Sequence, residues 1–318
     1  MPGPRSEAAL RLALETAFRT AGLESPRILS LEPLPGGSIN RAYRLVTETE
    51  TKTGAGTGTY FCKWNPEGPA DMFEREREGL DALAGADTGL KVPRVVALSP
   101  TAPLDPYHPD APSVPPVLVL EYLSSSPAAA SDRIWEELGR GLAALHRKGA
   151  EAFGFAGDNY CGLTPQENSW SKDWADFYGN RRIGVLIKRL EGAGKLGIKE
   201  TAVFHKLRGK LPSILDHGPM PSLIHGDLWS GNFLSSDQGP ALVDPAAYFG
   251  DREAEWGMML LFGGFPDRVL AAYQEAWPLP EGWRERLPLY QLYHLLNHFL
   301  LFGGGYGEQA MRVAARYL

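Results

Sequence analysis

Cysteine is scarce in this 318-residue chain: only Cys62 and Cys161 are present, too few for a disulfide framework. Basic residues number 32 against 38 acidic ones, so the net charge of -6 excludes a general basic footprint for nucleic acid. No apolar run approaches the roughly 18 residues of a membrane span, and the first residues lack the apolar core of a signal peptide. These absences predict a cytoplasmic protein with reduced thiols and no nucleic-acid or membrane partner.

Two catalytic signatures are also missing. The sequence contains no Gly-x-Ser-x-Gly element that would support a hydrolase. His294 and His298 stand one helical turn apart, but the residues between them lack the glutamate of the His-Glu-x-x-His metalloprotease motif. We therefore predict that both histidines are packing residues and not zinc ligands.

The composition that remains is that of a globular protein with a substantial core, since 43% of the residues are apolar and 22% are charged. The length suggests about two domains. Strand patterns dominate up to a buried apolar run at 117–123, and helical patterns dominate after it. We predict an α+β chain with a small strand-rich domain, residues 1–122, and a larger helical domain, residues 123–318.

The most informative stretch lies in the second domain. A short apolar run leads into His-Gly-Asp at 225–227, and Asn232 follows Asp227 by five positions. A second apolar run ends in Asp244. Phosphoryl transfer uses one carboxylate to accept the proton of the attacking hydroxyl, and an amide and a second carboxylate to hold magnesium. The kinase catalytic loop has the same five-residue step from Asp to Asn, so this set predicts a phosphotransferase site.

Two charged residues of the first domain could complete that site. Lys63 lies inside the apolar strand pattern 60–64, where a buried ammonium would need an anionic partner. On the following helix pattern Glu76 sits beside the apolar stripe, and we prefer it to Glu74 and Glu78 as that partner. The alternative is that Lys63 faces outward and that all three glutamates are surface residues.

Two further segments have both a functional and a structural interpretation. The glycine turn between the first strands could present backbone N–H groups to phosphate, or could be a plain hairpin turn. The long segment 153–182 is rich in aromatic and amide side chains, which suit a polyhydroxylated ligand, but it could equally be a packed loop. Residues 47–59 are polar and rich in Gly and Thr, and we predict a mobile hairpin connection there.

Taken together, these stretches resemble the fructosamine kinase (ketosamine 3-kinase) family, which shares the two-lobed protein-kinase-like fold with aminoglycoside phosphotransferases and choline kinases. The resemblance covers nearly the whole chain. Three features select this branch: the segment from Asp158 to Trp170, the His-Gly-Asp-Leu-Trp-Ser-Gly-Asn run and a terminal Phe-Gly-Gly-Gly-Tyr. The matching stretches are 35–40, 72–76, 158–168, 225–232, 244–245, 250–253 and 301–306. The main departure is the Thr/Gly-rich hairpin at 47–59, which we expect to lie away from the chemistry.

The resemblance implies ATP- and Mg²⁺-dependent phosphorylation of the sugar 3-hydroxyl of a ketosamine (fructosamine, ribulosamine or glycated lysine), after which the sugar is lost and the amine is repaired. Asp227 would be the catalytic base, and Asn232 and Asp244 would hold magnesium. The nucleotide would be bound by Gly36, Gly37, Ser38, Ile39, Asn40, Lys63, Glu76, Glu121, Tyr122 and Leu123. The sugar would meet Asp158, Asn159 and Trp229.

The nearest alternative is a kinase of another small hydroxyl compound, such as an aminoglycoside, choline or homoserine. A pseudokinase that acts as a binding module is a different class of protein. The presence of four polar residues that a kinase needs argues against it: Lys63, Asp227, Asn232 and Asp244. Gly226 replaces the arginine through which regulated protein kinases sense a phosphorylated loop, so we predict activity without prior phosphorylation. The sequence does not fix the oligomeric state, although a monomer is favoured.

Overall fold

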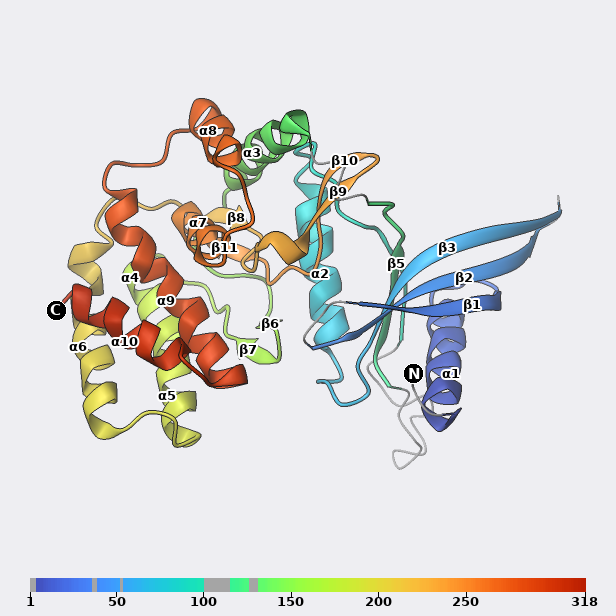
Figure 1. Ribbon diagram of the computed structural model, residues 1–318, viewed down its shortest axis with the longest axis horizontal. Helices are drawn as coiled ribbons and strands as arrows, with labels where there is room; N and C mark the ends of the chain where they lie inside the picture. Colours follow the sequence, from blue (N-terminus) through green and yellow to red (C-terminus); the bar gives the residue numbers. More distant parts are fainter. Residues whose placement is uncertain (1–3, 36–38, 52–53, 100–114, 126–130) are drawn as a thin grey trace.

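The computed structural model describes residues 4–35, 39–51, 54–99, 115–125 and 131–318. Its first part is a five-stranded antiparallel sheet in the order β1-β2-β3-β5-β4 (Figure 1). The elements are α1 (Pro4–Thr20), β1 (Arg27–Leu34), β2 (Arg41–Thr51), β3 (Gly54–Trp64), α2 (Met72–Gly85), β4 (Val95–Leu98) and β5 (Val117–Glu121).

Strand β5 shows why its sequence is apolar without alternation. Val117 and Val119 belong to the core formed with helix α1, whereas Leu118 and Leu120 belong to the core formed with helix α2. Because successive side chains of a strand point to opposite faces, a strand covered on both sides is apolar throughout. Leu10, Leu14 and Phe18 of α1 fill the first of these cores, at the four-residue spacing expected for a helix face.

A hairpin is present at 47–59, as predicted, but its described residues are mainly strand and not a connection. Strands β2 and β3 continue pairing from Arg41↔Trp64 to Thr51↔Gly54, so most of this segment is a ladder. Figure 1 shows the resulting hairpin projecting from the sheet, away from the helical part of the molecule. The threonines explain the error, since β-branched residues favour extended backbone even in a polar segment.

The second part is mostly helical and, in the residues that the structure describes, carries three two-stranded antiparallel sheets. Its helices are α3 (Asp132–His146), α4 (Trp174–Phe177), α5 (Val185–Gly192), α6 (Ile198–Ile214), α7 (Arg252–Leu261), α8 (Asp267–Ala276), α9 (Trp283–Phe302) and α10 (Tyr306–Arg316), with a π-helical turn at Tyr178–Gly184. Its strands are β6 (Asn159–Cys161), β7 (Thr164–Gln166), β8 (Ser222–Ile224), β9 (Phe233–Ser236), β10 (Gly239–Leu242) and β11 (Tyr248–Gly250).

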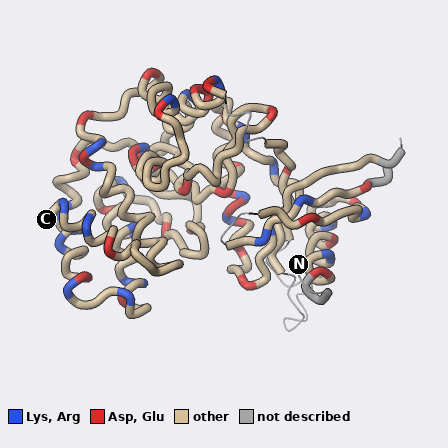
Figure 2. The backbone as a smooth tube through the Cα atoms, viewed as in Figure 1, with Lys and Arg blue, Asp and Glu red and all other residues tan. Residues whose placement is uncertain are grey.

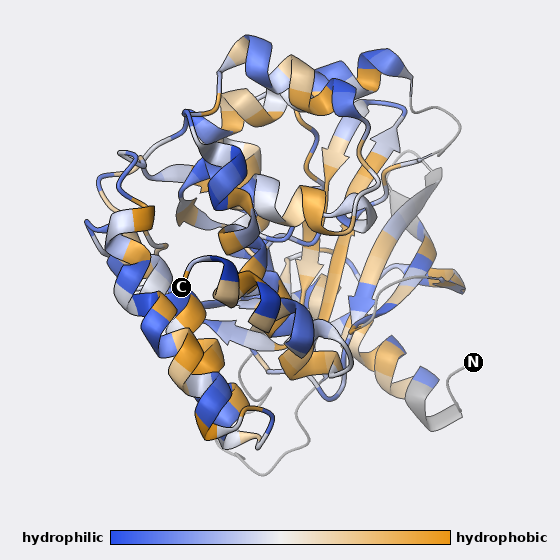
Figure 3. Ribbon diagram, turned by 60° about the vertical axis from the view of Figure 1, so that its left-hand side comes forward, coloured by the Kyte–Doolittle hydropathy of each residue, from blue (hydrophilic) through white to orange (hydrophobic). Residues whose placement is uncertain are grey.

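One large hydrophobic core unites the helices of this part. The strands of the sheet are largely hydrophobic, whereas the outer helices alternate between hydrophobic and hydrophilic residues (Figure 3). Positions of both charge signs are interspersed along the chain (Figure 2). Among the described residues no helix is long and apolar enough to cross a membrane. Cys62 and Cys161 are free, buried thiols.

The architecture is therefore α+β: a small antiparallel sheet with its helices, followed by a larger helical part. We propose the lobe boundary at residues 122/123, between β5 and α3. The two parts meet where Lys91, after α2, donates its N–H to Pro240 O at 2.8 Å and accepts from Leu242 N at 2.9 Å. Gly79 of α2 also lies against Pro245, to which an added Cβ would approach within 3.2 Å. These contacts bring the segment ending in Asp244 beside helix α2.

Candidate active site

The stretch at 225–227 is a tight turn that follows strand β8. Strand β8 pairs with β11, and Ala246 N donates to His225 O at 3.0 Å. Gly226 has a φ of 81°, and a Cβ there would lie 2.3 Å from Ala246 O. Only glycine combines a left-handed backbone with such a close approach. The local backbone thus supplies a structural reason for glycine at this position.

The carboxylate of Glu255, on helix α7, binds the backbone of this turn. It accepts the N–H of His225 at 2.5 Å and the N–H of Gly226 at 3.2 Å. Burial raises the pKa of Glu255, but the nearby imidazoles of His146, 3.7 Å away, and His225 bring that pKa below its ordinary value. The ionised carboxylate is therefore the form that fixes the backbone around Asp227.

Asn232 ties the two aspartates of the site together. Its amide nitrogen donates to Asp227 O at 2.9 Å and lies 3.5 Å from Asp227 Oδ2 and 3.4 Å from Asp244 O. Because the nitrogen is committed to these contacts, the amide oxygen is the group that could ligate a metal. That oxygen and the carboxylate of Asp244 are the hard oxygen donors that Mg²⁺ prefers, so the residues present fit the ion.

Lys63 lies between two carboxylates at the other side of the site. Its Nζ is 2.7 Å from Glu76 Oε1 and 2.6 Å from Asp244 Oδ1. Burial lowers the pKa of Lys63, but the two carboxylates outweigh it and leave the pKa above its ordinary value. The side chain is therefore a buried ammonium held by anions. The predicted pairing of Lys63 with Glu76 is confirmed, while Glu74 and Glu78 pair with Arg77 and Arg75.

The other residues predicted to bind the nucleotide lie in the glycine turn before β2 and at the end of β5. Gly36, Gly37 and Ser38 lie outside the described residues. Beyond them, Asn65 Nδ2 donates to Asn40 Oδ1 at 3.0 Å and approaches Ile39 O at 3.4 Å, which anchors the end of this turn to β3. At the end of β5, Glu121 N donates to Arg94 O at 2.9 Å. Its own carbonyl and the backbone of Tyr122 and Leu123 follow at the junction between the two parts of the molecule.

The amide-rich segment is a built network and not a plain loop. Asn159 is 4% exposed; its nitrogen donates to Ala247 O at 2.9 Å and its oxygen accepts from Gln166 Nε2 at 2.8 Å and Asn168 Nδ2 at 2.9 Å. These bonds occupy its oxygen, so Asn159 is placed to support the β6–β7 hairpin more than to reach a ligand. Asp158 is exposed and accepts Asn168 N at 2.8 Å.

Trp229 lies on the outer side of the same turn as Asp227. It is 40% exposed, and its ring lies against Gly231, where an added Cβ would meet the ring at 2.3 Å. A partly exposed tryptophan two residues from the Asp227 carboxylate offers an apolar face to a ligand. A larger residue in place of Gly231 would therefore require the Trp229 ring to move.

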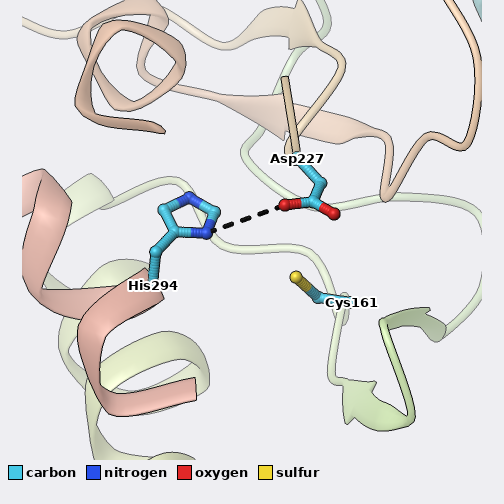
Figure 4. A group of neighbouring side chains, drawn as sticks. All are labelled: Cys161, Asp227 and His294. Carbon is cyan, nitrogen blue, oxygen red and sulfur yellow. Dashed lines mark ion pairs between the residues drawn. The ribbon is translucent and has the colours of Figure 1, made fainter. Parts of the chain in front are cut away.

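His294 is the site residue that sequence reasoning missed. The packing prediction is confirmed for His298, whose ring lies against Phe262, Phe302 and Tyr306. His294 instead points from α9 toward the catalytic turn, with Nδ1 4.0 Å from Asp227 Oδ1 (Figure 4). Burial lowers the pKa of His294 to about 3, so the imidazole is neutral. Its four-residue spacing from His298 gave no signal, because only the fold decides which face of α9 meets Asp227.

Asp227 itself stands in a setting that disfavours its charge. Burial is the first cause that raises its pKa well above the ordinary value, and the charges of Asp244 and Glu255 add to it. Hydrogen bonding from Asn232 works in the opposite direction. A carboxylate with a raised pKa is a stronger base than an ordinary aspartate, which suits proton abstraction from a hydroxyl.

A sheet lysine held by a helix glutamate, facing an Asp-x4-Asn turn and a second aspartate, defines a phosphotransferase of the protein-kinase-like class. The chain belongs to the fructosamine kinase family, whose model matches residues 14–318. It is accordingly an ATP-dependent phosphotransferase.

Individual relatives agree with this family. A probable ketoamine kinase from Synechocystis sp. is 38% identical over 298 residues, which are 92% of this chain and 91% of the relative. The chloroplastic protein-ribulosamine 3-kinase of Arabidopsis thaliana is 34% identical over 304 residues, or 93% and 84% of the two chains. A crystal structure from Thermobifida fusca that carries a fructosamine-3-kinase designation superposes with a TM-score of 0.78 at 32% identity, covering 95% of this chain and 97% of that one.

Proposed function

We propose that this protein transfers the γ-phosphoryl group of ATP to the sugar 3-hydroxyl of ketosamines, including fructosamine and ribulosamine adducts of lysine. The unstable 3-phosphate would then lose its sugar and return the free amine. The observation that carries the proposal is the carboxylate of Asp227, which has no cationic partner in the part of the chain that the structure describes and lies near the Lys63–Asp244 pair in a member of this family.

The nucleotide would lie against the sheet. Lys63, oriented by Glu76, would bind the phosphates, and the turn Gly36–Asn40 would cover them. Adenine would meet the backbone of Glu121, Tyr122 and Leu123, where the Glu121 N–H is already bonded to Arg94 O at 2.9 Å. Asn232 and Asp244 would hold Mg²⁺, which would neutralise charge on the phosphates.

Asp227 would do the proton chemistry at the acceptor. Asn232 and the bonds from Glu255 to the turn fix its backbone, so its carboxylate is oriented before the acceptor binds. The acceptor hydroxyl would donate to this carboxylate and lose its proton to it as the oxygen attacks the phosphorus. Trp229 and Asp158 would contact the sugar, with Asn159 supporting the hairpin behind them.

The acidic residues of the acceptor segment favour a neutral sugar over a polycationic aminoglycoside. Glu167 lies 3.6 Å from the guanidinium of Arg181. Asp173 caps helix α4 by accepting Asp176 N at 2.6 Å. Asp158 accepts Asn168 N at 2.8 Å, so all three acids between positions 158 and 174 are engaged within the protein, which argues against a segment built to bind a polycation.

A panel of acceptors tests the proposal. The protein is incubated with Mg²⁺-ATP and, separately, ribulosyl-lysine, fructosyl-lysine, kanamycin, choline and homoserine, and products are read by mass spectrometry. We expect a mass gain of one phosphate on one or both ketosamines. Phosphorylation confined to kanamycin, choline or homoserine would reject the ketosamine assignment while leaving the phosphotransferase class intact.

A further inference from the structure

Asp227, the proposed catalytic base, is one of three potential metal ligands that lie close together. They are the Cys161 thiol at the end of β6, the Asp227 carboxylate of the catalytic turn and His294 Nδ1 of helix α9 (Figure 4). One ligand atom from each lies within 4.8 Å of the other two. The three residues come from elements far apart in the sequence, so only the fold brings them together.

The imidazole of His294 has a buried nitrogen without a hydrogen-bond partner among the described residues. That nitrogen is Nδ1, and His294 is 4% exposed. The nearest carboxylate oxygen, Asp227 Oδ1, is 4.0 Å away, which is too far for a hydrogen bond. A buried polar atom without a partner is costly, so its orientation toward Cys161 and Asp227 calls for a ligand between them.

The chemistry of the three groups selects the ligand. Thiolate, imidazole and carboxylate together are a zinc set, with bonds of about 2.3 Å to sulfur and about 2.0–2.2 Å to nitrogen and oxygen. Two ligands at such bond lengths on a tetrahedral ion lie roughly 3.3–3.8 Å apart, so small side-chain rotations from the observed separations would close the site. Mg²⁺ requires hard oxygen ligands in octahedral geometry and would not compete there.

We propose that Cys161, Asp227 and His294 bind a thiophilic divalent cation, with Zn²⁺ as the type ion, and that this ion inhibits the enzyme by occupying the catalytic carboxylate. The ion would enter from the acceptor side, where the Asp227 side chain is 22% exposed. Binding releases the Cys161 thiol proton to solvent, while His294 and Asp227 donate lone pairs and water fills the fourth position. The inhibition rests on the proposed role of Asp227, but the binding does not.

Cobalt provides a readout that is independent of activity. Metal-free full-length protein is titrated with Co²⁺, and thiolate-to-cobalt charge-transfer absorption is followed in the near ultraviolet. We expect a saturable band at one equivalent that Zn²⁺ abolishes by displacement. Cys161→Ser should eliminate the band, and His294→Ala should weaken cobalt binding at least tenfold with the band retained. Cys62→Ser, which removes the other buried thiol in β3, is the matched control and should keep the band.

Enzyme assays at saturating Mg²⁺-ATP complete the test. Micromolar Zn²⁺ should inhibit the wild type competitively with the acceptor, and Cys161→Ser should require at least tenfold more zinc for the same inhibition. Three results would each overturn the proposal: no charge-transfer band, a band that survives in folded Cys161→Ser, or zinc inhibition that Mg²⁺ relieves equally in both proteins. Loss of ketosamine activity with an intact cobalt band would instead refute the proposed function alone.

Discussion

The two sides of the candidate active site differ in how their charged groups are paired. One side contains Lys63 with two carboxylates, and the other contains Asp227 with two uncharged groups. On the nucleotide side, the Lys63 ammonium lies within 2.7 Å of both Glu76 and Asp244, so charges are closely matched. On the acceptor side, the carboxylate of Asp227 faces the Cys161 thiol and the neutral imidazole of His294. Under the proposed function, one side would exchange its ion pairs for phosphates and metal. The other keeps a carboxylate that has no cationic partner among the described residues, which raises its basicity.

Removing the base should have the largest effect and should strike one side only. We expect Asp227→Asn to lower kcat by about 10²–10⁴-fold, because general-base catalysis contributes that much. ATP affinity, measured by calorimetry, should stay within about threefold of wild type, since Lys63 and its partners are untouched. Turnover close to the wild-type rate would mean that another group accepts the proton.

Breaking the nucleotide-side pair should produce the complementary defect. Glu76→Gln removes one of the two carboxylates that hold the Lys63 ammonium, and a charged hydrogen bond is worth about 1.5–3 kcal/mol. We expect kcat/KM for ATP to fall about tenfold to 100-fold in steady-state assays. Glu78→Gln on the same helix is the control, because its ion pair with Arg75 is partly exposed to solvent, and it should change kcat/KM less than about twofold. Equal effects of the two variants would contradict the role given to Glu76.

The catalytic turn between the two sides should be sensitive to a single methyl group. Gly226→Ala places a Cβ 2.3 Å from Ala246 O at a φ of 81°. We expect a loss of about 1–3 kcal/mol in the free energy of unfolding, measured in urea, with a larger loss of kcat. Gly209→Ala in helix α6 meets no described atom within 4 Å and should be neutral or slightly stabilising. Wild-type stability in Gly226→Ala would show that the turn can relax.

The raised pKa of Asp227 makes the acceptor side sensitive to acid. The base works only when ionised, so the rate should fall about tenfold per pH unit below its pKa. Because burial and the charges of Asp244 and Glu255 raise that pKa, the acid limb of the kcat/KM profile should lie well above the ordinary aspartate value of about 3.9. A limb near that value would show that the carboxylate is well solvated in the free enzyme.

Phosphorylation state should have the smallest effect. No arginine stands at position 226, and its glycine is fixed by backbone geometry. Protein treated with phosphatase and verified as phosphate-free by mass spectrometry should turn over at the rate of the untreated protein. An enzyme that becomes active only after treatment with another kinase would contradict this expectation.

The two sides of the site also differ in how much of each could be predicted from the sequence. Lys63 and Glu76 lie on consecutive elements, and their burial follows from local apolar patterns, so their pairing could be predicted. The strand-rich first part and its apolar strands could be predicted for the same reason. The meeting of Cys161, Asp227 and His294 depends on three distant segments, and no periodicity in any one of them reports on the others. Glu255 was missed similarly, since its role appears only when α7 reaches the turn at 225–227.

The position of the transferred phosphate tests the central claim most directly. Fructosyl-lysine and ribulosyl-lysine are incubated with the protein and Mg²⁺-ATP, and the product is followed by phosphorus–proton correlation NMR. We expect the phosphate on the oxygen of the third sugar carbon, followed by release of free lysine. A phosphate fixed on any other carbon, or no transfer to either compound while another alcohol is phosphorylated, would contradict it.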